Sequence, residues 1–465
     1  MKLGSRSLVD AILPLIAVMA LGLACRREAP PPQPPNVLLV TIDSLRADHL
    51  GCYGYARPTS PNLDRLAAEG ALFETAIAQA PWTLPSLVSL HTSRLPAEVG
   101  AFHNHGRLAD FAVTAAELFD AAGFRTAAFT AGAYTEPSRG FSQGFGTYQN
   151  LDNTHRAADL NRLALDWLDQ NGKRPFFLWI HYFDVHADYA APSPWNGLFD
   201  DTEAAPDAAR IGQMMRVVNG NAALEPGDLE KIGTSYDREI AYTDAMLGEL
   251  WRGLEQRGLA AGTALAVGAD HGEGLMEHGL LLHTLSVYDE FVRVPLVLRL
   301  PGRVPAGRRV TAQVRNLDVL PTLLELAGLA PPRDARGQGL LPLLGGAAAA
   351  VPGPAPVHTD TSSHEVQYSK LGEVRRELFD TFFAVRTTST KLVYSVNQDR
   401  YRLYDLARDP GEQRDIFSEQ GTAHAELRRA LAELRGIVPP PEKDAPPAAP
   451  TPREMEQLRA LGYIR

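Results

Sequence analysis

Short, strongly apolar segments alternate with helical segments along most of the chain, and this alternation limits the fold more than any other feature. The first apolar segment, residues 36–43 (NVLLVTID), is followed by a segment of helical periodicity at 61–70. Further strands are predicted at 126–132, 175–184, 263–270 and 294–301, and further helices at 114–124 and 156–172. Apolar strands that alternate with helices are typical of a parallel sheet covered on both faces. The sequence therefore predicts a three-layer α/β fold, with a mostly parallel sheet sandwiched by helices.

The pattern changes after a low-complexity stretch of Gly, Ala and Pro at residues 345–356. Two later segments, 381–395 and 400–406, are rich in β-branched and aromatic residues, which favour strands. They predict a smaller C-terminal subdomain with an antiparallel sheet. The polar stretch 190–230 is interpreted as a lid or an insertion near the site. The chain is predicted to contain a catalytic domain at residues 36–345, the C-terminal subdomain at 346–436, and a Pro-rich tail with a short helix at 437–465.

The beginning of the chain is typical of an export signal. A basic start precedes an apolar stretch at residues 11–24, which is shorter than the ~20 residues that a membrane-spanning helix needs. Residues 1–25 are predicted to be a signal peptide with a lipidation site at Cys25, and the Pro-rich residues 26–35 a tether. We expect an exported protein, in the periplasm or on the outer surface, that meets the membrane only through a lipid anchor. The alternative is an ordinary secreted protein.

The charge of the chain argues against one class of partner. Lys and Arg number 45 against 55 Asp and Glu, so the net charge is −10. The basic residues are scattered rather than clustered in a block. Because nucleic-acid phosphates are bound by clustered Lys and Arg, no nucleic-acid partner is expected.

Acids and histidines stand at the ends of three predicted strands. Asp43 ends the first strand, Asp184 and His186 end the strand that begins with PFFLWIHY, and Asp270 and His271 end TALAVGAD. The carboxyl ends of parallel strands meet at one edge of the sheet, where open α/β sheets bind their ligands. Carboxylates and imidazoles together can bind a metal ion. The sequence therefore predicts a metal site at this edge.

Six segments in order resemble motifs of one enzyme family. They are TIDSLRADHLGCYGY, PWTLPSLVSLHTSRLP, GADHGEGLMEHG, YDEFVRVPLVLRLPG, VRNLDVLPTLLELAGL and LYDLARDPGEQRDI, between residues 41 and 416. The chain is similar through these segments to the sulfatase family of the alkaline-phosphatase superfamily. The resemblance implies the fold predicted above, an ester hydrolase activity and a divalent metal cofactor.

The resemblance also implies roles for individual residues. Asp43, Asp270 and His271 would bind the metal together with the nucleophile, Thr83. His186 matches a histidine that contacts the substrate or leaving group, and His283 lies where many sulfatases carry a lysine. A mixed shell of carboxylate and imidazole favours zinc or manganese, with calcium or magnesium as alternatives.

Two departures from the family pattern affect the mechanism. Sulfatases carry Cys or Ser at the head of a C/S-x-P-S-R motif, and this residue is converted to formylglycine. Here Thr83 heads the motif, and Leu87 replaces its arginine. Oxidation of a threonine hydroxyl gives a ketone, so a formylglycine mechanism is not expected. A metal-bound threonine can instead act as an alkoxide nucleophile, which favours phosphorus esters.

Ser44 stands where sulfatases commonly have a second aspartate ligand. Its presence suggests a first metal site of lower charge. Asp184, His186 and His283 are a candidate second metal site, because two-metal relatives use one Asp and two His there.

The leading hypothesis is a metal-dependent hydrolase that cleaves phosphate diesters or monoesters outside the cytoplasm through Thr83. The alternatives are a sulfuric ester hydrolase, and a lipid-anchored protein that binds an anionic glycan or lipid without turnover. The substrate would be a small molecule, glycan or lipid ester. The oligomeric state stays open.

Overall fold

The computed structural model describes residues 34–199, 206–345, 353–361, 364–365, 373, 375, 378–420 and 424–438. The described residues from Pro35 onward belong to one compact unit. The predicted signal peptide, Cys25, nearly all of the tether and the tail from residue 439 lie outside the described residues. Within the described part of the chain, no helix combines the length and apolarity that crossing a membrane requires.

The central sheet has eight strands in the order β12-β2-β11-β7-β1-β6-β4-β5. The strands are β12 (Arg308–Val310), β2 (Ala71–Phe73), β11 (Leu296–Arg299), β7 (Thr263–Ala269), β1 (Asn36–Ile42), β6 (Phe176–Tyr182), β4 (Arg125–Ala131) and β5 (Thr147–Leu151). Every pair from β7 to β5 is parallel, whereas β11 is antiparallel to both of its neighbours. The prediction of a mostly parallel α/β sheet is confirmed.

One predicted strand differs from the observed one. The segment 294–301 was expected to belong to the parallel sheet, but β11 covers only Leu296–Arg299 and runs antiparallel to β7. The connection from β7 holds short strands and the four-residue helix α8 (Asp289–Val292) rather than a crossover helix. A parallel neighbour requires a crossover to the opposite edge of the sheet, which this connection does not make.

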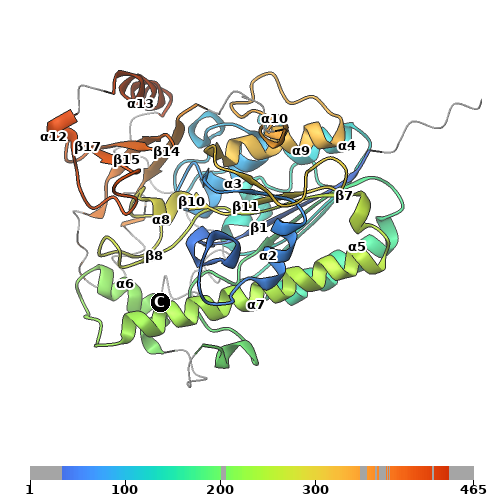
Figure 1. Cartoon of the computed structure of the whole chain (residues 1–465), viewed down its shortest axis with the longest axis horizontal. Coiled ribbons are helices and arrows are strands. Elements are labelled where there is room, and N and C mark those ends of the chain that lie inside the picture. The colour runs from blue at the N-terminus through green and yellow to red at the C-terminus, as the bar shows by residue number, and fades with distance from the viewer. Residues whose placement is uncertain are drawn as a thin grey trace, which may run out of the picture. The chain divides into compact units, whose positions relative to one another are not determined.

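Helices cover both faces of this sheet (Figure 1). One face carries α2 (Pro61–Ala68), α5 (Ala157–Asn171) and α7 (Asp228–Gln256). The other carries α3, α4 and α9, at Thr83–Thr92, Ala115–Ala121 and Val319–Ala327. The remaining short strands are β3 (Ala76–Ile77), β8 (Gly274–Leu275), β9 (Leu281–Leu282), β10 (Arg293–Val294) and β13 (Val314–Arg315). Two further helices are α6 (Ile211–Val218) and α10 (Leu341–Leu344). The predicted three layers are thus present.

A separate antiparallel sheet follows near the C-terminus, in the order β14-β15-β16-β17 (Figure 1). Its strands are Ala355–Asp360, Thr381–Arg386, Thr390–Ser395 and Arg400–Asp405. Helix α13 (Ala425–Ile437) buries its leucines against this sheet, and α12 (Phe417–Gln420) lies beside β17. The predicted C-terminal antiparallel sheet is confirmed, while the domain boundaries stay predictions.

The stretch 190–230 contains α6, which lies against β9. Residues 200–205 of this stretch are outside the described part of the chain. A lid function for it stays a prediction.

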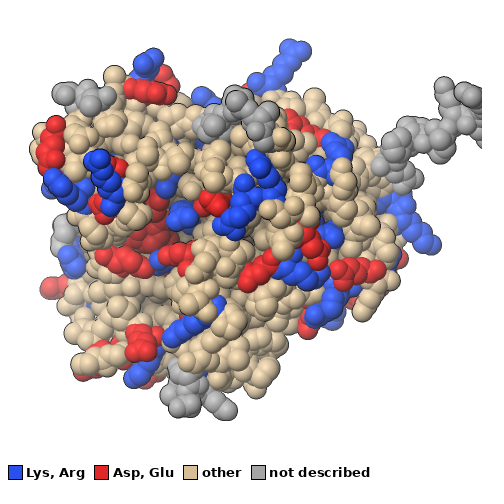
Figure 2. Space-filling model, in the orientation of Figure 1, with Lys and Arg blue, Asp and Glu red and all other residues tan. Residues whose placement is uncertain are grey.

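A polar cavity of 360 Å³ lies where α8 meets the loop after β1 and the C-terminal sheet. In Figure 2, acidic and basic side chains lie together in a hollow near the position of α8 in Figure 1. Arg46 bonds to Asp48 at 2.7 Å and to Glu277 at 2.5 Å, and Arg386 bonds to Asp289 at 2.7 Å. Because these opposite charges pair with one another across the cavity wall, we assign them a structural role.

Candidate active site

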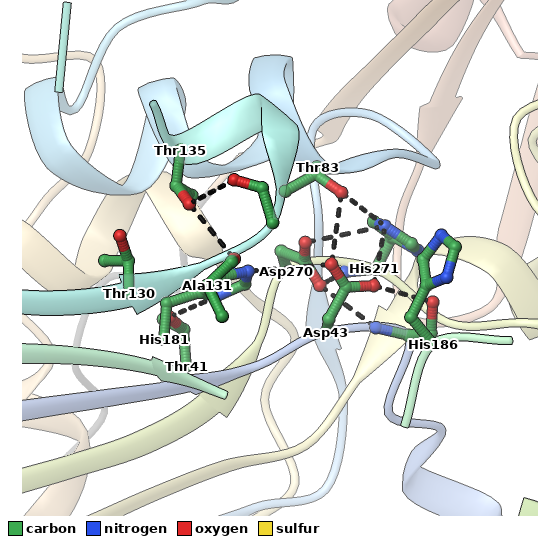
Figure 3. A network of polar contacts seen from close by, with 12 residues as sticks. Thr41, Asp43, Thr83, Thr130, Ala131, Thr135, His181, His186, Asp270 and His271 are labelled. Carbon is green, nitrogen blue, oxygen red and sulfur yellow. Dashed lines mark hydrogen bonds and ion pairs between the residues drawn. The ribbon is translucent and has the colours of Figure 1, made fainter. Parts of the chain in front are cut away.

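Two buried carboxylates meet at the carboxyl edge of the sheet. Strand β1 pairs in register with β7, so Ile42 lies opposite Ala269, and Asp43 and Asp270 are the next residues of their chains. Both side chains are fully buried (Figure 3). Ser44 has a left-handed backbone (φ 55°). Its N–H donates to Asp270 Oδ1 at 3.3 Å, and its hydroxyl donates to Asp43 Oδ1 at 2.8 Å.

His271 presents a lone pair to these carboxylates. Its Nδ1 lies 2.8 Å from the carbonyl oxygen of Gly272, which can only accept, so Nδ1 carries the proton and Nε2 the lone pair. Nε2 lies 3.4 Å from Asp270 Oδ2 and 3.7 Å from Asp43 Oδ1. Burial, with the neighbouring His283, lowers the pKa of His271 to about 3. The imidazole is therefore neutral.

Thr83 is the first residue of α3, directly above this group (Figure 3). Its Oγ1 lies 3.3 Å from Asp43 Oδ2 and 3.3 Å from His271 Nε2. Ser86, one turn on, donates its hydroxyl to the carbonyl oxygen of Asp270 at 2.5 Å and so joins α3 to the end of β7. The positive end of the α3 dipole therefore faces the site, where it favours an anionic substrate group.

The donor set fits a divalent metal ion. Ligand atoms of Asp43, Asp270 and His271 lie within 4.8 Å of one another, and no other such group occurs among the described residues. Asp270 Oδ2 is buried and has no hydrogen-bond partner in the described structure. Burial and the charge of Asp43 raise the pKa of Asp270 well above its ordinary value. A bound cation would compensate two buried carboxylates and a lone pair that face one another.

Two further histidines border this group. The ring of His283 lies 4.4 Å from the ring of His271 and 5.1 Å from the ring of His186. His283 Nδ1 lies 3.2 Å from Glu273 Oε1, and the Tyr189 hydroxyl donates to Glu273 Oε2 at 2.9 Å. Burial lowers the pKa of His283 to about 4 and raises that of Glu273 to about 7. The structure therefore brings His186 and His283 beside the predicted ligands, as the sequence suggested.

Asp184 lies elsewhere. It accepts a hydrogen bond from the backbone N–H of Ala157 at 2.9 Å, and it lies 3.5 Å from the guanidinium of Arg156. Asp184 is thus engaged at the N-terminus of α5, and among the described residues it belongs to no metal-binding group with His186 and His283. The structure does not assemble the second metal site predicted from these three residues.

His181 is a site residue that the sequence reasoning missed. It lies on β6, fully buried, with Nε2 3.5 Å from Asp43 Oδ2 (Figure 3). One signal could have found it, because it is the single histidine inside the otherwise apolar and aromatic strand FFLWIHY.

The fold and the site are those of a sulfatase-like ester hydrolase, and comparison with known proteins gives the family. The family described as Sulfatase matches residues 35–329. The family described as N-sulphoglucosamine sulphohydrolase, C-terminal, matches residues 276–436. The chain belongs to the sulfatase family.

Several relatives match over most of their length. An N-acetylglucosamine-6-O-sulfatase of Bacteroides thetaiotaomicron is 24% identical, over 91% of this chain and 90% of its own. Human arylsulfatase A is 27% identical, over 90% of each chain.

Solved structures share the fold. One, in complex with its substrate D-glucosamine-2-N,6-O-disulfate, gives a TM-score of 0.71 at 22% identity, over 89% of this chain and 100% of that one. The phosphonate monoester hydrolase of Agrobacterium radiobacter gives 0.71 at 22% identity, over 86% and 95%.

Proposed function

We propose that this protein is a metal-dependent hydrolase that cleaves phosphate diesters, phosphate monoesters or sulfate esters with Thr83 as its nucleophile. The observation that carries the proposal is the position of Thr83 Oγ1, 3.3 Å from both Asp43 Oδ2 and His271 Nε2 at the start of α3. Asp43, Asp270 and His271 would hold the metal with Thr83. A bound divalent cation would lower the pKa of the Thr83 hydroxyl and stabilise negative charge on the transferred group.

The reaction would proceed in two displacements. Thr83 Oγ1 attacks phosphorus or sulfur, so that a new bond to Oγ1 forms as the bond to the alcohol oxygen breaks. Water then attacks the phosphorus or sulfur of the threonine ester, and the bond to Thr83 Oγ1 breaks. The product is a phosphate monoester from a diester, phosphate from a monoester, or sulfate from a sulfate ester. His186 has Nδ1 2.6 Å from the carbonyl oxygen of Ala187, and Nδ1 of His283 faces Glu273. Their Nε2 atoms can therefore accept a proton from Thr83 or water and return it to the leaving alcohol.

Phosphorus esters are the favoured substrates in this proposal. A threonine ester has no route equivalent to the elimination that formylglycine provides, and phosphothreonine is released by attack of water on phosphorus. The likeness of the fold to a phosphonate monoester hydrolase supports this choice. The second candidate is a sulfatase proper, and the sulfatase names of the sequence relatives favour it.

The test compares ester classes on the full-length chain, with zinc and with manganese. The substrates are 4-nitrophenyl phosphate, bis-4-nitrophenyl phosphate, a phosphonate monoester and 4-nitrophenyl sulfate. Thr83→Ala should abolish turnover, and Thr83→Ser should keep part of it. Thr92→Ala is the matched control, because Thr92 lies at the other end of α3 and bonds only within that region. Dominant sulfate turnover would favour the second candidate. Turnover that survives in Thr83→Ala would exclude the nucleophile.

We also propose that the protein is exported and anchored by a lipid on Cys25, as the apolar stretch before this residue suggests. Fractionation of cells that produce the full chain tests this. Wild type should sediment with membranes, whereas Cys25→Ser should not carry the lipid. Equal lipid labelling of both forms would contradict the anchor.

A further inference from the structure

We propose that His181 is a positioning residue that fixes the Asp43 carboxylate for metal binding, at the end of a buried hydrogen-bond chain that begins at Trp179. This inference rests on the metal site of the proposed function. It concerns residues on β1 and β6 that are fully buried. The chain runs from the Trp179 indole through the Thr41 hydroxyl to the His181 imidazole and then to Asp43. Figure 3 shows Thr41, His181 and Asp43.

The direction of the chain follows from the donors available. Trp179 Nε1–H can only donate, and it lies 3.0 Å from Thr41 Oγ1. The single proton of the Thr41 hydroxyl has two acceptors within reach, the Ile180 carbonyl at 3.5 Å and His181 Nδ1 at 2.9 Å. The shorter distance favours His181 Nδ1 as the acceptor.

That choice places the ring proton on Nε2, which faces Asp43 Oδ2 at 3.5 Å. The opposite tautomer would point a lone pair at a carboxylate between two fully buried side chains, which is repulsive. The distance is longer than an ordinary hydrogen bond, yet a dipole directed at a charge still acts over it where the dielectric is low. The hydroxyls of Ser44 and Thr83 bond to Asp43 from other directions, at 2.8 Å and 3.3 Å. Asp43 is therefore oriented from three sides.

The start of the chain is rigid. The Trp179 ring contacts the rings of His91 at 4.2 Å, Phe141 at 5.7 Å and Phe145 at 6.1 Å. His91 belongs to α3, the helix that begins with Thr83. The indole thus has a fixed orientation. Its N–H fixes the Thr41 hydroxyl, which in turn fixes the His181 ring that faces the Asp43 carboxylate.

Packing alone does not call for a histidine at this position. Strands β1 and β6 are already joined by their backbone ladder, in which Thr41 pairs with His181. An apolar side chain of similar volume would fill the space without burying two ring nitrogens, which cost free energy unless they are satisfied. The polar chain is accounted for if its last N–H acts on Asp43.

The experiment measures metal affinity on the full-length protein, by competition between the protein and a chelator for zinc. Partners that orient a metal ligand typically change affinity about tenfold to hundredfold when they are removed. We expect His181→Leu to weaken zinc binding within that range. Thr41→Val, which removes the hydroxyl from the chain but keeps its shape, should weaken it by a smaller factor. Hydrolysis by both variants should recover at high zinc concentration with little change in kcat.

Thr130→Val is the matched control, because Thr130 pairs with His181 from β4 but does not belong to the chain (Figure 3). It should bind zinc as tightly as wild type. Equal affinity in wild type, His181→Leu and Thr41→Val would overturn the positioning role while the proposed function stands. Wild type that binds no metal would overturn both. If His181→Leu does not fold, the comparison of Thr41→Val with Thr130→Val decides, and equal losses in these two would overturn the proposal.

Discussion

At the scale of single residues, the site holds more negative charge than a buried cluster can keep without a cation. Asp43 and Asp270 are both fully buried at adjacent strand ends. Burial alone would raise the pKa of Asp43, but the nearby imidazole of His181 and the other neighbouring histidines outweigh it and lower that pKa. Asp270 bears the consequence, since burial and the Asp43 charge raise its pKa. Without metal, the repulsion between these two buried carboxyl groups therefore destabilises the folded protein.

We predict that Asp270→Asn makes the metal-free protein more stable and abolishes its stabilisation by metal. The variant removes a group whose ionisation next to Asp43 is unfavourable, and its amide can donate to His271 Nε2, which lies 3.4 Å from Asp270 Oδ2. The expected gain is about 1–2 kcal/mol in the free energy of unfolding without metal. Thermal unfolding with and without zinc measures both effects.

Asp120→Asn is the control, because Asp120 is exposed on α4 and far along the chain from the site. It should leave both the stability and its rise with zinc unchanged. A loss of stability in metal-free Asp270→Asn would contradict the electrostatic argument.

The sequence could predict the metal group because each member directly follows a strongly apolar strand. It could not predict the role of His181, which depends on the register that places this residue opposite Thr41. The resemblance to two-metal relatives also suggested a grouping of Asp184 with His186 and His283. Asp184 instead faces Arg156 and the start of α5, a contact that no local pattern encodes.

At the scale of elements, the long helix α7 was not predicted, and its burial explains why. Its residues Tyr236–Glu239 are all buried although most are polar, so the apolar stripe of an amphipathic helix is interrupted. Helix α3 escaped prediction for a related reason, since all ten of its residues are buried and no polar face remains. Strands β1, β6 and β7 were predictable because continuous apolar runs of their length suit buried parallel strands.

Helix α7 approaches α2 closely through Gly248. A Cβ at this position would lie 2.3 Å from Asn62 Oδ1, and Asn62 donates its side-chain and backbone N–H groups to Asp244 at 2.8 and 2.9 Å. We predict that Gly248→Ala lowers the free energy of unfolding by about 1–3 kcal/mol, because Asn62 must move away from Asp244. Urea unfolding measures the change.

Gly233→Ala is a control within the same helix, since a Cβ there meets no atom within 4 Å. It should raise stability by up to about 1 kcal/mol, because alanine favours a helix over glycine. A destabilising effect of the same size at both positions would contradict the packing argument.

The same helix carries a buried acid that makes stability depend on pH. Burial raises the pKa of Glu239 to about 8, against the effect of Arg156, which lies 3.3 Å away. The folded protein therefore keeps a proton that the unfolded chain loses above its ordinary pKa of 4.5. Because the folded state binds more protons, stability falls as the pH rises between these two values.

We predict that Glu239→Gln removes this fall. Relative to wild type, the variant should gain stability with rising pH, by at most about 1.4 kcal/mol per pH unit from about pH 5 to about pH 8. Urea unfolding of both proteins across this range measures the difference. Glu249→Gln, on an exposed position of α7, should show none. If the difference in the free energy of unfolding between Glu239→Gln and wild type does not change with pH, Glu239 is not the source of the pH dependence.

At the scale of the whole compact unit, contacts from the C-terminal sheet hold the loop after β7, which carries His271, in place. Lys391 on β16 is fully buried and binds Asp289 at 3.0 Å and Glu412 at 3.0 Å. Asp289 begins α8, and the carbonyl oxygens at Glu290 and Phe291 accept hydrogen bonds from Glu273 and Gly272, directly after His271. The position of His271 therefore depends on contacts that begin in another sheet.

We predict that Lys391→Met lowers the free energy of unfolding by about 3–5 kcal/mol, because it leaves Asp289 and Glu412 buried with one cation too few. Arg386, which also binds Asp289, cannot compensate both acids. The double variant Lys391→Met/Glu412→Gln should recover much of this loss, since it removes the excess charge while the glutamine oxygen can still accept from the Asp289 N–H, now 2.6 Å from Glu412 Oε2. Urea unfolding of the wild type and the single and double variants measures the coupling. Because both variants carry methionine at position 391, a double variant that is less stable than Lys391→Met alone would contradict the charge-balance argument.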